Sequence, residues 1–266
     1  MNIVFLANIL KLSKMFNPKI SIILPNYNSQ KTLKDTVKSV IEQTYQNWEI
    51  IIIDDSSNTE TKNILSEYEK DKRFIIKYLN KNKGTAFCRN LALRSCVGEY
   101  VAFLDSDDIW SKEKLEKQIN FMNENNYSFT YTYYSTFKSQ NNKKIINIIK
   151  PPSSFNFDSF TKDTSISTST MIVKKHFAKK FKFTNTQICE DYFYKCLLLK
   201  EIKFAHCLKE FLTLYKIRNH SLQSKKLRNL YWIWKINQNY NKFNLLRNFV
   251  SLFCISINSL KKYGFK

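Results

Sequence analysis

The chain has 266 residues, enough for one sizeable α/β domain with an appendage or for two small domains. Its net charge of +21 and pI near 9.6 indicate an anionic partner, such as nucleic acid, a phospholipid surface or a phosphorylated substrate. Only three glycines occur, which excludes the Gly-rich loops of dinucleotide-binding and P-loop proteins. No apolar run approaches the roughly 20 residues that cross a bilayer, so we expect no membrane span.

Residues 1–17 form an N-terminal extension with apolar residues at roughly helical spacing, two lysines and no acid. Two interpretations stay open, a helix that touches a membrane or an extension upstream of a true start at Met15. No basic residue precedes the apolar run and no small-residue cleavage site follows it, so we do not predict a signal peptide.

From Lys19 onward, short apolar runs alternate with segments of helical spacing. This alternation predicts buried strands joined by helices in a mostly parallel, doubly wound α/β sheet. The predicted strands are 19–24, 48–53, 74–79 and 101–104. The predicted helices are 29–44, 59–71, 85–95 and 113–122.

The second half of the chain is less regular. Residues 128–137 and 168–173 are predicted as strands, and 188–200 as a helix. Glu190 and Asp191 open this helix, and one interpretation is that they only complement the helix dipole. Because 140–163 contains Lys-Lys, Pro-Pro and several Ser and Asn residues, we expect a long surface excursion there.

The stretch YVAFLDSDDIW, residues 100–110, runs from an apolar strand into three aspartates within four positions. Carboxylates this close repel one another, so a cation or several hydrogen-bond donors must share the space. Oxygen ligands favour Mg²⁺ or Mn²⁺ over zinc, and Mg²⁺ usually completes its shell with water and substrate phosphates. The alternative is a solvated acidic turn in which Asp108 or Ser111 caps the next helix. The three aspartates are Asp105, Asp107 and Asp108.

Two other polar loops also follow predicted strands, at 25–28 and at Asp54–Asp55. In open α/β sheets ligands bind where the carboxyl ends of the strands open into loops, so we expect all three loops at one crevice. A solvated turn gives no reason for neighbouring loops to match. The convergence therefore favours a functional acidic site.

From Ser221 to the end the chain has nine basic residues and no Asp or Glu. The pattern predicts a basic amphipathic helical tail at residues 223–266 that lies on an anionic membrane surface. The alternative is that the apolar stripe packs on the core and the lysines are solvated. The stripe consists of Leu246, Phe249, Val250, Phe253 and Ile257.

The chain resembles the family 2 glycosyltransferases of the GT-A fold in five stretches: SIILPNYN, TVKSVIEQTYQNWEIIIIDDSS, NKGTAFCRNLAL, GEYVAFLDSDDIW and CEDYFYKCLLL. The resemblance covers about residues 18–222, which we take as a GT-A domain with a Rossmann-like sheet flanked by helices. It implies an inverting, metal-dependent, non-processive glycosyltransferase that moves one sugar from a nucleotide sugar, expected to be a UDP-sugar.

The resemblance also implies residue roles in binding the nucleotide sugar. Pro25, Tyr27 and Asn28 are expected to line the nucleotide pocket, and Asp55 is expected to hydrogen-bond the uracil ring. Arg89 lies in a position similar to the Ala-Arg-Asn segment of the family and is expected to steady the donor.

The acidic cluster is similar to the DxD-type motif, whose acids hold the ribose and a divalent metal on the diphosphate. Asp105, Ser106 and Asp107 are expected to contact the donor. We expect Asp107 or Asp108 to bind the metal directly, with Mn²⁺ or Mg²⁺ as the ion.

For the acceptor side, Asp191 resembles the general base that takes the proton of the acceptor hydroxyl. Glu190 beside it, and Arg218 and His220 in YKIRNHSL, are expected at the mouth of the active site. Two positions depart from the family pattern, because Ser56 stands where glycine is usual and Cys88 where alanine is common. The processive QxxRW motif is not found in the sequence.

The expected acceptor is a glycan or a lipid-linked sugar of bacterial envelope polysaccharide or lipooligosaccharide synthesis. We expect a cytoplasmic protein, peripheral on the inner face of the membrane, with no nucleic-acid partner. Two alternatives are kept. A nucleotidyltransferase would share the sheet and the bound metal, but it is expected to carry a Gly-rich, Arg-containing loop after the first strand. A basic nucleic-acid-binding protein would explain the charge but not the acids at the strand ends.

Overall fold

The fold is built on one sheet whose strands are mostly the apolar runs of the sequence. The computed structural model describes residues 17–138, 144–184, 186, 188–217 and 226–263. The strands are β1 (Ile20–Asn26), β2 (Trp48–Asp54), β3 (Phe74–Tyr78), β4 (Tyr100–Phe103), β5 (Ile109–Trp110), β6 (Phe129–Phe137), β7 (Ile145–Ile149), β8 (Ser154–Phe155), β9 (Ile172–Lys174) and β10 (Ala205–Lys216). The helices are α2 (Leu33–Ile41), α3 (Thr59–Ser66), α4 (Thr85–Ser95), α5 (Lys114–Glu124), α6 (Phe157–Phe160), the 3₁₀ turn η1 (Thr168–Thr170), α7 (Lys175–Lys180), α8 (Glu190–Ile202), α9 (Lys226–Asn239) and α10 (Leu245–Tyr263).

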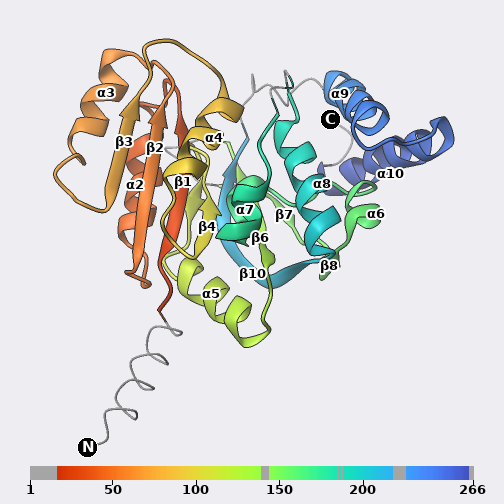
Figure 1. Cartoon of the computed structure of the whole chain (residues 1–266), viewed down its shortest axis with the longest axis horizontal. Coiled ribbons are helices and arrows are strands. Elements are labelled where there is room, and N and C mark those ends of the chain that lie inside the picture. Colours follow the sequence, from red (N-terminus) through yellow and green to blue (C-terminus); the bar gives the residue numbers. More distant parts are fainter. Residues whose placement is uncertain (1–16, 139–143, 185, 187, 218–225, 264–266) are drawn as a thin grey trace, which may run out of the picture.

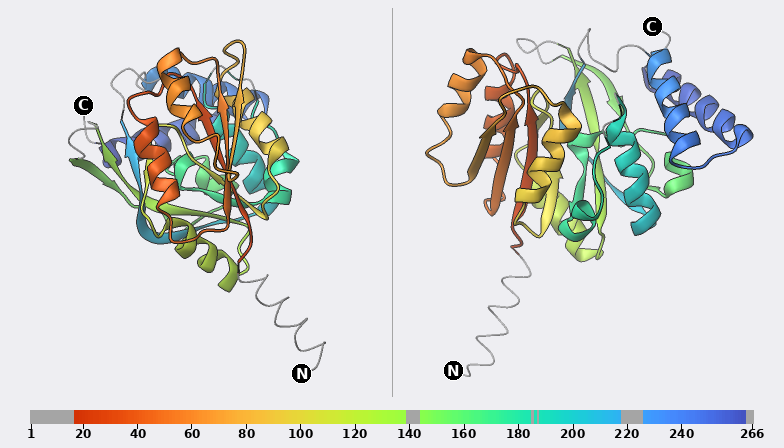
Figure 2. Two further views of the ribbon diagram at one scale, coloured as in Figure 1. Left: turned by 90° about the vertical axis from the view of Figure 1, so that its left-hand side faces the viewer. Right: turned by 45° about the horizontal axis from the view of Figure 1, so that its top comes forward.

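The strands lie in the order β3-β2-β1-β4-β9-β6-β10-β5, with β7 paired to β6 and β8 to β10 (Figure 1). The first four are parallel, as predicted. β1, β2 and β4 are mostly apolar and buried because both faces of the sheet are covered there, whereas the edge strand β3 is partly exposed. Ile22 and Leu24 of β1 pack in the cluster that holds α2, α3 and α5, whereas Ile23 packs with α4, α7 and α8. Figure 2 shows α2 and α4 on opposite sides of the sheet.

The second half of the sheet mixes directions. β9 is antiparallel to both β4 and β6, and β10 is parallel to β6. The carboxyl ends of β1 to β4, β6 and β10 therefore lie at the same edge. This half adds strands that the sequence analysis missed: β10, and β7 and β8 within the expected surface excursion 140–163, which also holds α6. The predicted strand 168–173 is instead η1 followed by β9.

The C-terminal segment is helical, as predicted, and packs on the core through Ile233, Ile236 and Ile255. α9 and α10 lie at the end of the molecule opposite α3 (Figures 1 and 2). Within the described ranges, no helix has both the length and the apolar character needed to span a bilayer. The expectation for the N-terminal extension falls on residues 1–16, which lie outside the described residues.

At Gly98, between α4 and β4, the chain passes close to the start of β1. A Cβ added there would lie 2.6 Å from the Lys19 carbonyl oxygen and 2.6 Å from the Ser21 nitrogen. Gly98→Ala is therefore expected to lower the free energy of unfolding by about 1–3 kcal/mol, measured by urea denaturation. The control is Val97→Ala at the neighbouring exposed position, which should change stability by less than about 0.5 kcal/mol. Equal midpoints for both variants would contradict the close approach.

Candidate active site

The loops that follow β1 and β2 are joined to each other by hydrogen bonds. The Asp55 N–H donates to the Asn26 carbonyl at 2.8 Å, and the Asn28 N–H donates to Ser57 Oγ at 2.9 Å. In return, the Asn58 N–H donates to Asn28 Oδ1 at 2.8 Å. Asn28 adopts φ of 47°, a conformation that asparagine tolerates better than most residues. The two loops thus form one surface.

The acidic loop after β4 joins this surface. Thr32 Oγ1, at the start of α2, donates to the Ser106 carbonyl at 2.8 Å. The three polar loops that the sequence analysis placed at one crevice therefore meet at the carboxyl edge of the sheet, at the top of Figure 1. Lys216, at the end of β10, lies at the same edge and lines a hollow of about 250 Å³ together with residues 28–32.

The expected nucleotide residues occupy this surface. Pro25 is partly buried near the end of β1, and Tyr27 is 49% exposed, available for a planar ligand. The Asp55 carboxylate is buried and accepts from the backbone N–H groups of Lys83 at 2.7 Å and Gly84 at 2.8 Å. Each carboxylate oxygen keeps a further lone pair, so the expected contact to uracil stays a prediction.

Ser56 occupies a backbone conformation that favours glycine. Its φ is 63°, in the left-handed region where a side chain is strained. The departure of this sequence from the family pattern therefore falls on a position where glycine is the natural residue. The turn is held by the Asp54 carboxylate, which accepts from the Ser57 N–H at 3.0 Å and from Asn26 Nδ2 at 2.7 Å.

The three aspartates of the acidic loop do different things. Asp108 is 1% exposed, and both its oxygens accept from the protein, one from Ser169 Oγ at 2.5 Å and one from the Lys216 N–H at 2.8 Å. Burial, and after it the charge of Asp107, raises the pKa of Asp108. Asp108 therefore ties the loop to η1 and β10. Which of the two expected metal ligands binds the ion stays a prediction.

Arg89 links the acidic loop to α8. Its buried guanidinium donates to Asp105 Oδ1 at 2.7 Å and to Glu190 Oε1 at 3.0 Å. Burial opposes the charge on Arg89, but the carboxylates around it outweigh burial and raise its pKa. Burial also raises the pKa of Glu190, and Arg89 opposes that rise. Arg89 contacts Asp105, which was expected to contact the donor, and the expected role of Arg89 in steadying the donor stays a prediction.

Asp191, the expected base, is held beside this pair in the first turn of α8. Asp191 Oδ2 accepts from Lys195 Nζ at 2.8 Å and from Thr168 Oγ1 at 3.1 Å. Burial favours the neutral acid, but Lys195 and then Arg89 outweigh it and hold the pKa of Asp191 well below its usual range. Lys195 is 2% exposed and also donates to the Ile166 carbonyl at 2.9 Å. The carboxylate is therefore ionised at neutral pH.

A strained residue precedes α8. Cys189 has φ of 63°, and this left-handed turn directs the first residues of the helix toward the site. The sequence analysis missed Thr168, Ser169 and Lys195. Lys195 stands four residues after Asp191 in a predicted helix, and this acid-to-lysine spacing was the available signal. Arg218 and His220 lie outside the described residues.

The donor set at this edge fits a hard divalent cation. The acidic side chains there offer oxygen ligands, which suit Mg²⁺ or Mn²⁺. In the part of the chain that the structure describes, no three His, Cys, Asp or Glu side chains form a metal-holding group. One or two carboxylates with diphosphate oxygens and water are a usual Mg²⁺ environment, so the residues present fit that mode of binding.

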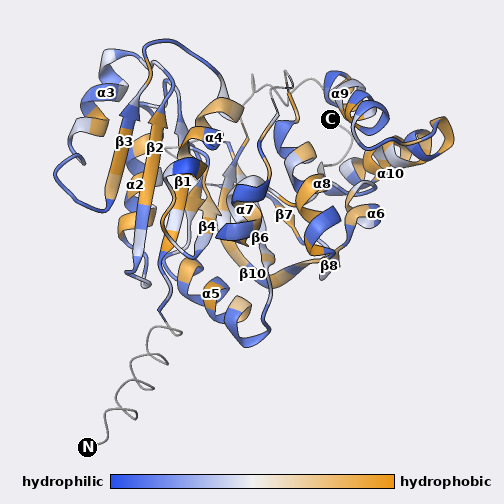
Figure 3. Ribbon diagram, viewed as in Figure 1, coloured by the Kyte–Doolittle hydropathy of each residue, from blue (hydrophilic) through white to orange (hydrophobic). Residues whose placement is uncertain are grey.

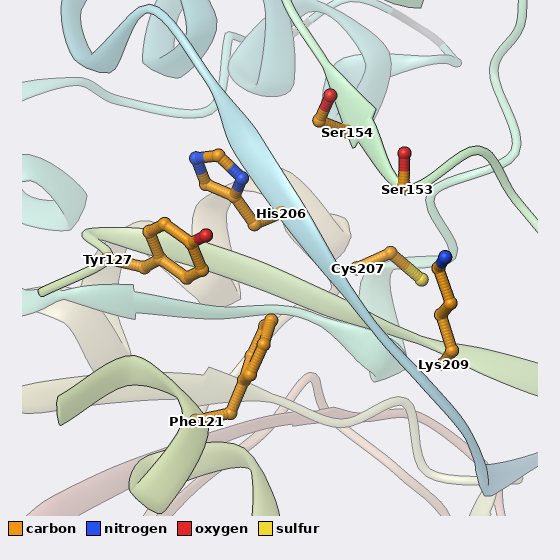
Figure 4. Close-up of a pocket in the computed structure, with 7 residues that line it drawn as sticks. All are labelled: Phe121, Tyr127, Ser153, Ser154, His206, Cys207 and Lys209. Atoms are coloured by element: carbon orange, nitrogen blue, oxygen red, sulfur yellow. The ribbon is translucent and has the colours of Figure 1, made fainter. Parts of the chain in front are cut away.

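A larger hollow of about 440 Å³ lies at the opposite edge of the sheet. Its lining includes His206 near the start of β10 and Tyr127 before β6, whose rings stack at 3.7 Å between centroids (Figure 4). These are the amino ends of two strands whose carboxyl ends point to the candidate site. The hollow is therefore separate from the acidic loops.

Comparison with known proteins agrees with this geometry. The profile described as "Glycosyl transferase family 2" matches residues 21–193. The putative teichuronic acid biosynthesis glycosyltransferase TuaG of Bacillus subtilis (strain 168) is 35% identical over 248 residues, 93% of this chain and 98% of that protein. The UDP-Glc:alpha-D-GlcNAc-diphosphoundecaprenol beta-1,3-glucosyltransferase WfgD of Escherichia coli is 32% identical over 247 residues, 92% of this chain and 95% of that protein.

Solved structures share the fold. S. aureus TarS 1–349 in complex with UDP-GlcNAc matches with a TM-score of 0.70 at 20% identity, over 91% of this chain and 73% of that one. The mannosyltransferase PcManGT from Pyrobaculum calidifontis, in complex with GDP-Man and Mn²⁺, matches with a TM-score of 0.66 at 13% identity, over 94% and 76%. The fold is GT-A, and the protein is a glycosyltransferase. The chain belongs to glycosyl transferase family 2, as the resemblance implied.

Lys195→Met tests the electrostatics of Asp191. The substitution removes the ammonium that most strongly favours the charged carboxylate, so the pKa of Asp191 is expected to rise, as measured by NMR titration of ¹³C-labelled aspartate carboxyls. Lys180→Met, at an exposed lysine of α7, is the matched control and should leave this pKa unchanged. An unshifted Asp191 pKa in the Lys195 variant would contradict the assigned cause.

Proposed function

We propose that this glycosyltransferase moves a single sugar from a UDP-sugar to a lipid-linked or glycan acceptor, with inversion at the anomeric carbon. The observation that carries the proposal is the distribution of acids at the carboxyl edge of the sheet. One group, Asp105 and Asp107, follows β4, and the second, Glu190 and Asp191, opens α8, with Arg89 between them. A single displacement needs two such sites, one for the leaving group and one for the attacking hydroxyl.

The donor is proposed to be UDP-linked because features of the site and the names of the relatives both support a UDP-sugar. Tyr27 offers an exposed ring, and Asp55 offers fixed oxygens to an imide N–H. WfgD is named for UDP-Glc, and the TarS structure holds UDP-GlcNAc. We assign Mn²⁺ or Mg²⁺ to Asp107. A bound divalent ion neutralises the charge that develops on a departing diphosphate.

Asp191 is proposed as the general base. The contacts of Lys195 and Thr168 fall on Oδ2, which leaves Oδ1 to accept a proton from an acceptor hydroxyl. Because the pKa is low, the carboxylate is ionised at any pH near neutrality, and its fixed orientation directs the hydroxyl oxygen at the donor. Arg89 keeps the charges of the two acidic groups from repelling each other.

The setting is proposed to be envelope polysaccharide or lipooligosaccharide synthesis at the inner face of the cytoplasmic membrane. TuaG is named for teichuronic acid biosynthesis, and WfgD is named for an acceptor on diphosphoundecaprenol. The 223–266 tail, with its basic residues, is the proposed contact with the anionic membrane surface. No observation favours the nucleotidyltransferase or nucleic-acid-binding alternative over this assignment.

Asp191→Asn separates catalysis from donor binding. The amide cannot take the acceptor proton, so transfer should fall by roughly 10²–10⁴-fold, measured with radiolabelled UDP-sugar. UDP binding, measured by calorimetry, should stay within about twofold of the parent. Asp158→Asn, at an acid whose side chain is 66% exposed, is the control and should keep full activity. Near-normal turnover by Asp191→Asn would refute the base assignment.

Asp107→Asn tests the metal ligand. UDP with Mn²⁺ should stabilise the parent against heat, by about 2.7 kcal/mol at a ligand concentration of 100 times Kd. In the Asp107 variant the increment due to Mn²⁺ should disappear. Asp108→Asn should instead lower stability without ligand and keep the Mn²⁺ increment, because Asp108 bonds Ser169 and Lys216. The reverse outcome would move the metal to Asp108. The same assay with different UDP-sugars identifies the donor.

A further inference from the structure

Helix α10 buries polar side chains on its core-facing side, beside Ile255, and exposes an apolar stripe on the other side. Asn248 and Ser251 are each 1% exposed, whereas Leu246 is 75% and Phe253 is 67% exposed. At about 100° per residue, the exposed apolar positions fall on one stripe opposite the buried polar residues. An ordinary surface helix has the reverse arrangement. We name this stripe the outer face of α10, and it consists of Leu245, Leu246, Phe249, Val250 and Phe253.

Hydrogen bonds fix the inner side of α10. Asn237 of α9 donates through Nδ2 to Asn248 Oδ1 at 3.2 Å and Ser251 Oγ at 3.1 Å, and Ser251 Oγ donates to the Thr161 carbonyl at 2.5 Å. Tyr192 of α8 donates to Asn237 Oδ1 at 2.7 Å. Rolling α10 to bury its outer face would break these bonds and leave buried amides without partners, which is costly. The outer face is therefore a built feature of the fold.

The outer face has an accessible position. α10 lies at the end of the molecule farthest from α3, where its apolar residues appear orange in Figure 3. Its five side chains are 42–75% exposed. A contiguous apolar stripe of this kind, outside a packed core, marks an interaction surface.

The charge around the outer face identifies the occupant. From Ser221 to the end the sequence has nine basic residues and no acid. Arg247 and Lys262 of α10 form ion pairs with Asp158 and Asp163, whereas Lys242 just before α10 and Lys261 near its end are exposed and supply the basic surround. An apolar stripe with a basic surround matches the headgroup region of an anionic bilayer, where side chains enter the acyl boundary and ammonium groups meet phosphates. A second copy of the chain fits poorly, because a two-fold contact would bring the basic surrounds together.

We infer that the outer face of α10 inserts into the surface of an anionic bilayer as a preformed docking face. The inference deepens the proposed function, since it names how the tail meets the membrane that carries lipid-linked acceptors. It differs from the usual behaviour of a basic amphipathic tail, which folds when it meets lipid. Here the helix and its orientation are set by the protein before contact.

The test is co-sedimentation of the full chain with phosphatidylcholine vesicles, with and without phosphatidylglycerol. The parent should bind the vesicles that contain phosphatidylglycerol and release them at high salt. Leu246→Ser/Phe253→Ser should weaken this binding at least tenfold, because both side chains point outward and neither contributes to the bonds of Asn237. The matched control is Val97→Ser/Phe204→Ser, at two exposed apolar residues that lie just before β4 and just before β10, away from α10. This variant should bind vesicles like the parent.

Three results would overturn the inference. They are no binding of the parent to either vesicle, equal binding by the Leu246/Phe253 variant, or a parent dimer in sedimentation velocity that this variant dissociates. Circular dichroism of the variant checks that it folds, and Phe249→Ser/Phe253→Ser gives a second measurement if it does not. Asp191→Asn should bind vesicles like the parent, so loss of transfer and loss of docking are separate outcomes.

Discussion

The candidate site depends on one buried cation. The guanidinium of Arg89 lies between the acidic loop after β4 and the first turn of α8, two segments far apart in the chain, and bonds Asp105 and Glu190 at once. The guanidinium carbon of Arg89 also lies 5.2 Å from the centroid of the Phe183 ring. Removing one partner of such a buried pair typically costs about 3–5 kcal/mol, because the remaining charge has no solvent. Without Arg89, the two acidic groups would repel each other across the site.

Around this cation, the acids divide into those that build the site and those left to act on a ligand. Asp54 and Asp108 have their oxygens engaged by the protein, and they hold loops and strands in place. Asp191 is engaged on one oxygen only. A cluster of carboxylates in a sequence therefore does not reveal which member meets a ligand, since this depends on donors from distant segments.

The first half of the fold could be predicted from the sequence because its signals are local. The strands β1, β2 and β4 are mostly apolar on both faces, and the apolar residues of the intervening helices recur at helical spacing. Residues 85–95 were accordingly predicted with the bounds that α4 has. The meeting of the polar loops followed from the parallel order alone. Asp105, Arg89 and Asp191 were named from the motifs, and the structure brings them together.

The rest depended on contacts that no local pattern encodes. β10 was missed because its register shifts around residues 208–213 interrupt the alternation of a strand. One partner of Asp108 is the backbone N–H of Lys216, which sequence spacing cannot identify. For α10 the apolar stripe was read correctly, but amphipathic spacing does not say which stripe faces the core. The hydrogen bonds that Asn248 and Ser251 accept from Asn237 determine which side of α10 faces the core.

The bond between Tyr192 and Asn237 has one more consequence. Tyr192 follows Asp191 directly in α8, and Asn237 carries the bonds that orient α10, so hydrogen bonds connect the helix of the proposed base to the docking face. If that face rests on lipid, the height of Asp191 above the membrane plane is fixed. The enzyme would then select acceptors by length. A lipid-linked sugar chain that is too short or too long to bring its terminal hydroxyl to that height would not be used.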